Sequence, residues 1–220
     1  GIVYEYGANY LKDAGGRVSK LVTGTLSDGL VEVDGPVWTV DAEGTVLDRP
    51  DEETRRWTYE DGITRLGKQL LGRSGATVRR ETRITDVRHD GDWHLTAAAG
   101  TEHGPYDALL LNPPAPQTAD LLTETGVGAV DRLGEAAGEV GYNTGWTAVL
   151  GYDFALDVPY YGLASTDEEG AVGWIGREEQ KPGHVPDGQS VLVVQARSAW
   201  AADRYGDPSA KHAAALGARG

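Results

Sequence analysis

Tyr106-Asp-Ala-Leu-Leu-Leu-Asn-Pro-Pro-Ala-Pro-Gln117 joins a short apolar run to three prolines. The run from Ala108 to Leu111 predicts a buried strand, and the prolines, which fix φ and lack a backbone donor, stop that strand at Pro113. A short helix is predicted over residues 118–122. Ligands of open α/β sheets bind beyond the carboxyl ends of the strands, so a cofactor is first expected here. On this pattern alone, a strand and a proline-capped helix without any ligand is the simpler interpretation.

The segments on either side alternate between helical and strand patterns. Apolar residues at helical spacing, followed by glycine, predict helices over residues 18–26 and 61–72, and residues 126–138 are predicted as a small-residue helix or loop. Apolar alternation between turn residues predicts strands over residues 1–6, 37–40, 45–47, 76–79, 84–88, 93–97, 146–153, 160–165, 172–177 and 190–196. A layered α/β part followed by an antiparallel sheet gives an α+β or α/β fold class.

The composition is acidic and poor in lysine. The 220 residues include 34 acidic and 20 basic side chains, which gives a formal net charge of −14, and only five of the basic residues are lysines. An overall basic surface for nucleic acid is therefore excluded. A dense carboxylate surface with few lysines is typical of proteins that stay dissolved in high salt, so we expect a halophilic source. The absence of cysteine excludes disulfides, thiolate nucleophiles and Cys-ligated metals.

No membrane or export signal is recognisable in the chain. No apolar run approaches the roughly 20 residues of a membrane span, and no charged-then-apolar leader precedes the first segment, so a cytoplasmic protein without membrane contact is expected. The chain begins at Gly1, contains no methionine and closes in the helix-like residues 211–216. These features predict an internal segment of a longer protein.

Motifs for hydrolytic, phosphate or metal chemistry are missing. The sequence has no phosphate loop, no nucleophile elbow and no H-E-x-x-H pair, and Gly126-Val-Gly128 lacks both the third glycine and the preceding strand of a dinucleotide fingerprint. The five histidines lack ligand spacing, so they are predicted to be solvated and no metal site is expected. The pairs Glu168-Glu169 and Glu178-Glu179 are likewise predicted to be surface carboxylates rather than acid–base groups.

Two features favour a flat ligand. The small residues of Gly7-Ala8-Asn9-Tyr10 allow another backbone or a planar ring to come close. The C-terminal strands carry aromatic residues that can form one wall of a pocket for a planar molecule, namely Trp146, Tyr160, Tyr161 and Trp174. Ordinary half-buried aromatic residues covering a sheet are the simpler interpretation for any one of them.

Six segments resemble one known family in the same order along the chain. They are Tyr4-Glu-Tyr-Gly-Ala-Asn-Tyr10, Trp57-Thr-Tyr-Glu-Asp-Gly62, Ser74-Gly-Ala-Thr-Val78 running to Thr82-Arg-Ile-Thr-Asp-Val87, Leu111-Asn-Pro-Pro-Ala-Pro-Gln117, Lys181-Pro-Gly183 and Leu192-Val-Val-Gln-Ala-Arg-Ser-Ala-Trp200. The chain resembles the renalase-type branch of the FAD-dependent amine oxidase superfamily, and especially haloarchaeal members described as NAD(P)/FAD-dependent oxidoreductases. The acidic composition agrees with an archaeal, halophilic origin.

The resemblance implies a two-domain flavoprotein with FAD as cofactor. Residues 1–10 and 57–122 would form part of an FAD-binding domain of the glutathione-reductase type, and residues 11–56 and 123–220 an antiparallel-sheet substrate domain. The cofactor-binding residues implied are Gly7, Ala8, Asn9 and Tyr10 near the flavin, Arg83 and Ile84 at the adenine end, and Pro113 near the dinucleotide. Gln195 and, on the aromatic sheet, Trp174 are the substrate contacts expected.

The implied reaction is hydride transfer from a reduced nicotinamide or an amine to the flavin, without a side-chain general base, so no catalytic residue is assigned. Three features depart from the family. Asn9 replaces a glutamine, and both the glycine-rich loop and the C-terminal Gly-Asp segment of the family would lie outside residues 1–220. This segment alone is therefore expected to bind FAD poorly. The alternatives are a non-catalytic binding module and a hydrolase that uses Glu178 or Asp167. The flavoprotein reading requires the strand before Pro113 and residues 7–10 to meet around one flat ring.

Overall fold

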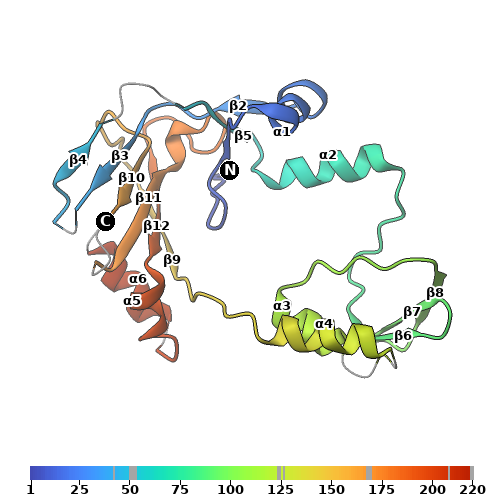
Figure 1. The fold of residues 1–220 in the computed structure, drawn as a ribbon. Coiled ribbons are helices and arrows are strands. Elements are labelled where there is room, and N and C mark those ends of the chain that lie inside the picture. Colours follow the sequence, from blue (N-terminus) through green and yellow to red (C-terminus); the bar gives the residue numbers. More distant parts are fainter. Residues whose placement is uncertain are drawn as a thin grey trace. The chain divides into compact units, whose positions relative to one another are not determined.

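The computed structural model describes residues 1–41, 43–49, 54–122, 125, 127–166, 170–207 and 209–218 (Figure 1). The chain divides into two compact units. Unit 1 consists of Gly1–Ala76 and Asn143–Gly220, and unit 2 consists of Thr77–Tyr142. This division differs from the predicted domains, since residues 1–10 and 57–76 belong to unit 1; the functional assignment of the domains stays a prediction.

A six-stranded mixed sheet forms the larger part of unit 1. Its order is β4 (Val46–Asp48), β3 (Val37–Val40), β10 (Gly162–Ser165), β11 (Val172–Arg177), β12 (Ser190–Ala196) and β9 (Thr147–Tyr152), with β3 and β10 parallel and the other neighbours antiparallel. Val193 and Val194 on β12 are fully buried. Helices α5 (Ser198–Ala202) and α6 (Ser209–Gly217) follow β12, and Leu216 of α6 joins the core of this sheet.

A second, three-stranded sheet of unit 1 carries the N-terminal segment. Its order is β1 (Leu11–Lys12), β5 (Arg56–Tyr59) and β2 (Leu30–Glu32), all antiparallel. All four residues of the central strand β5 are buried. The helix α1 (Gly16–Lys20), a π-helical turn at Leu21–Thr25, the helix α2 (Thr64–Ser74) and a 3-10 turn at Glu178–Gln180 complete this unit. Gly75 ends α2 with φ 67°, the left-handed conformation in which glycine avoids the Cβ penalty.

Unit 2 combines an antiparallel meander with two helices. The strands β6 (Ile84–His89), β7 (Trp93–Ala97) and β8 (Glu102–Tyr106) pair in sequence order, and α3 (Ala115–Leu122) packs on α4 (Gly128–Gly138). Gly91 makes the β6–β7 turn with φ 113°. The strands predicted over residues 84–88 and 93–97 are therefore confirmed, and they form a hairpin. None of the helices that the structure describes in either unit is long and apolar enough to cross a membrane.

Three of the predicted strands are wrong. Residues 108–111, 76–79 and 1–6 are not strands, and β8 (Glu102–Tyr106) was not among the predicted strands. Leu110, expected to be buried, is 92% exposed. A strand forms only where a neighbour takes up its backbone hydrogen bonds, and among the described strands none pairs with these segments. The local apolar pattern could not supply that partner. The coarser prediction of a mixed α/β fold with antiparallel sheet is confirmed.

Candidate functional site

Five of the predicted ligand-contacting residues lie around one hollow of unit 1. Gly7, Ala8, Asn9 and Tyr10 lead into β1, and Trp174 reaches them from β11; together they line a space of about 240 Å³. A Cβ placed on Gly7 would meet nothing within 4 Å, so the backbone there is open to an approaching ring. The hollow therefore combines an open backbone with two aromatic side chains.

Gln195 on β12 anchors the segment that borders this hollow. Its side-chain Nε2 donates to the carbonyl oxygen of Gly7 at 2.9 Å and to that of Tyr6 at 3.2 Å. Thr147 Oγ1 also donates to the Tyr6 oxygen, at 3.1 Å. The residue predicted as a substrate contact thus has its amide N–H groups engaged with the chain itself, where they fix the course of residues 6–7.

Tyr10, Tyr161 and Trp174 form an aromatic triangle beside the hollow. Their ring centroids are 5.9, 6.0 and 5.9 Å apart, at edge or tilted angles. Two strand glycines make room for the indole, because a Cβ on Gly162 would lie 2.6 Å from its ring carbon Cη2 and one on Gly176 would lie 2.9 Å from its Nε1. These glycines are the sequence signal for the triangle that periodicity alone does not reveal.

Several polar atoms of this region lack a partner. Asn9 Oδ1, Trp174 Nε1 and the Tyr161 hydroxyl are sealed from solvent and, among the residues described, accept or donate no hydrogen bond. Burial raises the pKa of the Tyr161 phenol well above its ordinary value, and the nearby carboxylates of Glu178 and Glu5 raise it further. Unpaired buried polar groups of this kind cluster where a ligand or water completes the site.

A buried ionic network lies next to the triangle. Lys181 Nζ donates to Glu5 Oε2 at 2.8 Å and to Glu178 Oε1 at 2.7 Å, and the ammonium is 5.8 Å from the centre of the Tyr161 ring. His184 Nδ1 lies 2.8 Å from Glu178 Oε2, and its Nε2 lies 2.9 Å from the carbonyl oxygen of Tyr59. The four side chains, Glu5, Glu178, Lys181 and His184, are at most 6% exposed.

The hydrogen bonds fix the net charge of this network. The Tyr59 carbonyl only accepts, so His184 Nε2 carries a proton. The contact between Nδ1 and Glu178 requires a second proton on one of those two groups, and either placement makes the pair neutral. The positive charge of Lys181 balances the negative charge of Glu5. The whole network is therefore neutral, which is the condition under which buried charges are tolerated.

The network corrects three predictions. Glu178 is fully buried rather than solvated, and so are His184 and, near Trp146, His212. Glu178 and His184 pair with each other and with Lys181 nearby in sequence, but distant residues complete the network: Glu5 is 176 positions from Lys181, and the Tyr59 carbonyl is 125 positions from His184. Both carboxylate oxygens of Glu178 are engaged, which removes it as the acid–base group of a hydrolase. Asp167, Glu168 and Glu169 lie outside the described residues.

The same network shows why no metal is expected here. Ligand atoms of Glu5, Glu178 and His184 lie within 4.8 Å of one another, close enough to surround a cation. The Lys181 ammonium already stands between the two carboxylates at hydrogen-bonding distance. The chain thus supplies its own cation at this position.

Unit 2 contains a separate cavity that brings together the other predicted cofactor residues. Arg83, Ile84 and Pro113 line a space of about 610 Å³, together with Thr85, Gln117, Asp120 and Leu121. Apolar and polar groups alternate around it. Residues 7–10 and Pro113 belong to different units, so their convergence around one ring stays a prediction.

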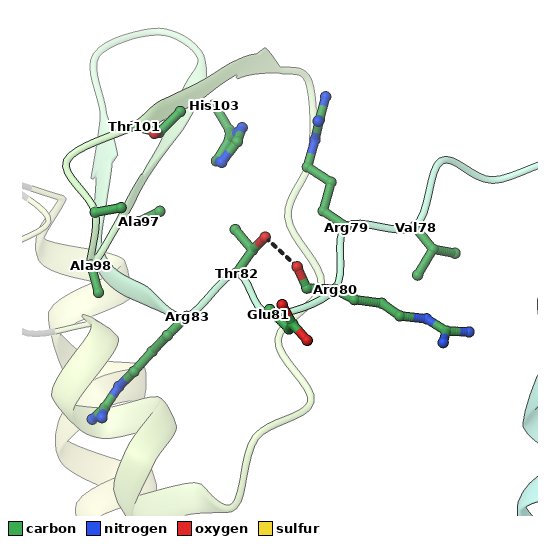
Figure 2. A pocket seen from close by; sticks show the side chains of 11 residues that line it. Val78, Arg79, Arg80, Glu81, Thr82, Arg83, Ala97, Ala98, Thr101 and His103 are labelled. Atoms are coloured by element: carbon green, nitrogen blue, oxygen red, sulfur yellow. Dashed lines mark hydrogen bonds between the residues drawn. The ribbon is translucent and has the colours of Figure 1, made fainter.

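A second hollow of unit 2, of about 530 Å³, lies between residues 78–83 and the end of the β7–β8 hairpin (Figure 2). Figure 2 shows Arg79, Arg80 and Arg83 leaving the loop in different directions. Thr82 Oγ1 donates to the Arg80 carbonyl at 2.9 Å, and Glu81 has φ 54°, a left-handed conformation that is uncommon for this residue type. The guanidinium groups do not converge on one point, so this hollow is a less definite ligand site than the cavity at Pro113.

Comparison with known proteins defines the fold but not a family. No family profile matches the chain. A protein described as a protoporphyrinogen oxidase from Exiguobacterium sp. 255-15 is similar with a TM-score of 0.55 and 19% identity, over 78% of this chain and 37% of that one. Wild-type putrescine oxidase bound to putrescine is similar with a TM-score of 0.55 and 11% identity, over 74% of this chain and 34% of that one. Reduced UDP-galactopyranose mutase is similar with a TM-score of 0.54 and 15% identity, over 70% of this chain and 35% of that one.

These similarities establish that the chain has part of the fold of two oxidases and a mutase. The chain spans about a third of the length of these proteins, between 34% and 37%. The shared fold can therefore be stated, whereas the class of protein, the reaction and the substrate have to be argued from the site.

Proposed function

We propose that this chain is part of an FAD-dependent oxidoreductase of the amine oxidase type. The observation that carries the proposal is the hollow at residues 7–10, where Trp174 meets the segment that the family resemblance places near the flavin. The fold shared with two oxidases supports it independently. A non-catalytic binding module is the less favoured alternative, since it explains neither the shared fold nor the arrangement of these residues.

Each unit, taken by itself, contains residues that suit one part of FAD. Around the hollow, the open backbone at Gly7 and the rings of Tyr10 and Trp174 suit a flat isoalloxazine. In unit 2, Ile84, Pro113 and Leu121 offer apolar walls to a purine. Gln117 and Asp120 add polar groups to that cavity, and the Asp120 carboxylate can accept a hydrogen bond from a ribose hydroxyl or an amino group.

In the proposed mechanism the chain binds, orients and excludes water. Bound FAD would supply the hydride acceptor for the reaction. Gln195 holds the Tyr6 and Gly7 carbonyls, and Glu5, tied to Lys181, fixes the chain two residues earlier. Tyr10 and Trp174 present aromatic surface to the ligand. No described side chain is required as a base, and the substrate proposed is a reduced nicotinamide or an amine.

The proposal is tested by the flavin content of the full-length protein. We expect it to purify with FAD, detected by visible absorbance, and Ala8→Trp to lower the FAD content because the indole occupies the hollow. Leu47→Trp is the matched control, since Leu47 on β4 is 58% exposed and is not among the residues around the hollow. A full-length protein that binds no FAD, or Ala8→Trp with unchanged FAD content, contradicts the proposal.

A further inference from the structure

Lys181 is connected to both walls of the hollow in unit 1. Residues 7–10 form one wall and Trp174 forms the other. Glu5 lies two residues before the first wall, and Glu178 lies four residues after Trp174. The Lys181 ammonium donates to both carboxylates, at 2.8 Å to Glu5 Oε2 and at 2.7 Å to Glu178 Oε1. One nitrogen atom therefore links the two chain segments that carry the walls.

The side chains at this link have little freedom to move. Those of Lys181, Glu5 and Glu178 are at most 4% exposed. Glu5 Oε1 also accepts hydrogen bonds from Thr58 Oγ1, at 2.8 Å, and from the backbone N–H of Ile63. Hydrogen bonds between charged groups are short and directional, whereas the hydrophobic effect has no direction. The link therefore fixes where Glu5 lies, and with it the start of the first wall.

Lys181 also contacts the aromatic triangle. Its Nζ lies 5.8 Å from the centre of the Tyr161 ring, a distance at which the ring attracts a cation. The Tyr161 ring is in turn 5.9 Å from the rings of Tyr10 and Trp174, which line the hollow. Lys181 itself is not among the residues around the hollow. It thus reaches both walls a second time, through packed rings.

Stability alone does not explain a buried lysine at this place. The desolvation of buried ions often costs as much as their pairing returns, and apolar residues of similar volume can replace such groups without loss of stability. An apolar side chain cannot supply two hydrogen bonds of fixed length and direction. A role in geometry therefore accounts for Lys181 better than a role in stability.

We propose that Lys181 is a positioning residue that sets the separation between residues 7–10 and Trp174, and thereby the affinity of the hollow for a flat ring. This inference rests on the proposed function, in which that ring is the isoalloxazine of FAD. Lys181 acts through Glu5 and Glu178 and does not touch the ligand. Walls that are held in place before binding raise the affinity, because less ordering accompanies binding.

The double variant Lys181→Met/Glu5→Gln tests the proposal, because it removes the link and still leaves the network neutral. The matched control is Lys211→Met/Asp207→Asn, which makes the same kind of change at an exposed ion pair of unit 1. FAD is titrated into the flavin-free full-length proteins, and binding is followed by flavin fluorescence. We expect the Kd for FAD to rise by at least about tenfold in the first variant and by less than about twofold in the control.

Two further measurements separate positioning from loss of stability. Thermal unfolding shows the temperatures at which each variant is folded, and binding is measured only there. The visible circular dichroism of FAD at saturation reports the surroundings of the ring, so it should change in Lys181→Met/Glu5→Gln and not in the control. If this variant does not fold, Lys181→Arg replaces it. Arginine keeps the charge but places a wider planar group between the carboxylates, so FAD should again bind more weakly than to the wild type.

The proposal is overturned by an unchanged Kd for FAD in the folded variant, by an equal loss of affinity in the control, or by an unchanged dichroism spectrum. A wild type that binds no FAD contradicts the proposed function instead. Amide hydrogen exchange of the flavin-free proteins then decides about Lys181. Faster exchange at residues 6–10 in Lys181→Met/Glu5→Gln than in the control supports its positioning role, and equal exchange overturns it.

Discussion

Replacement of Tyr161 by phenylalanine should leave the protein as stable as before or more stable. The Tyr161 side chain is fully buried and its hydroxyl has no partner among the described residues. A buried hydroxyl without a hydrogen bond costs about 1–3 kcal/mol, so Tyr161→Phe is expected to raise the free energy of unfolding by about 1 kcal/mol. The packing of the ring against Tyr10 and Trp174 is retained in this variant.

Tyr59→Phe is the matched control, because Tyr59 is equally buried but its hydroxyl donates to the Leu26 carbonyl at 2.7 Å. Loss of that hydrogen bond should lower the free energy of unfolding by about 1 kcal/mol. The two substitutions remove the same atom from two buried rings and are expected to act in opposite directions. Urea unfolding at neutral pH measures both.

The loss of folding stability at alkaline pH gives a second measurement of the same prediction. Burial, followed by the charges of Glu178 and Glu5, raises the pKa of Tyr161 in the folded protein, whereas the unfolded chain ionises near pH 10. The folded state therefore binds the proton more tightly. Its contribution to stability is present below about pH 10 and is lost above it, by about 1.4 kcal/mol per pH unit until the folded pKa is reached. Tyr161→Phe should show a shallower loss between about pH 10 and pH 11.

The reasoning is refuted if Tyr161→Phe destabilises the protein as much as Tyr59→Phe does, since the hydroxyl would then have a partner in solution. It is also refuted if the alkaline loss of stability is the same in Tyr161→Phe and in the wild type. The pKa of Tyr59 is raised by burial as well, so part of the alkaline loss persists in the variant. The comparison therefore uses the difference between the wild type and Tyr161→Phe in how steeply stability falls with pH.

Three further predictions concern the elements around the hollow. Lys181→Met leaves the buried network with a net charge of −1, and it should lower the free energy of unfolding, measured in urea, by about 3–5 kcal/mol. Adding Glu5→Gln restores a neutral network and should recover part of that loss. Gln195→Ala frees the carbonyl groups of residues 6 and 7, so the free energy of unfolding should fall by about 1 kcal/mol. Amide hydrogen exchange at these residues should become faster even without ligand. An unchanged exchange rate would mean that Gln195 acts only as a substrate contact. Gly176→Ala places a Cβ 2.9 Å from Trp174 Nε1 and should cost about 1–3 kcal/mol, measured by thermal unfolding, with a changed near-UV signal from the indole.

The elements that the sequence predicts well are those with a local cause. The β6–β7 hairpin follows from its Asp90-Gly91 turn, and α2 follows from apolar spacing and its terminal glycine. The small residues at positions 7–10 predicted close approach of a backbone or a planar ring, and the structure places them with Trp174 around a hollow; binding of a cofactor there stays a prediction. Short-range chemistry is sufficient for such features.

Features with a non-local cause were missed. Residues 108–111 have the composition of a buried strand, but pairing requires a second strand, and the described part of the chain provides none for them. Glu178 and His184 lie in polar sequence that predicts solvent exposure. They pair with each other and with Lys181, and the network is completed by Glu5, which is 176 positions from Lys181 and meets it only in the folded chain. Local sequence patterns contain no information about that contact.

The charges of unit 1 separate into a surface set and a buried set, and the two sets differ in what they require of the fold. On the surface, pairs such as Arg55 with Glu32 exchange easily with water, so an unpaired surface charge carries little information. In the interior each charge must be matched, and Glu5, Glu178, Lys181 and His184 match one another. Arg56 is 9% exposed, its Cζ lies 5.4 Å from the centre of the Tyr10 ring, and among the described residues no carboxylate pairs with it. The four matched groups therefore depend on the contact between Glu5 and Lys181, which are 176 positions apart and meet only in the folded chain.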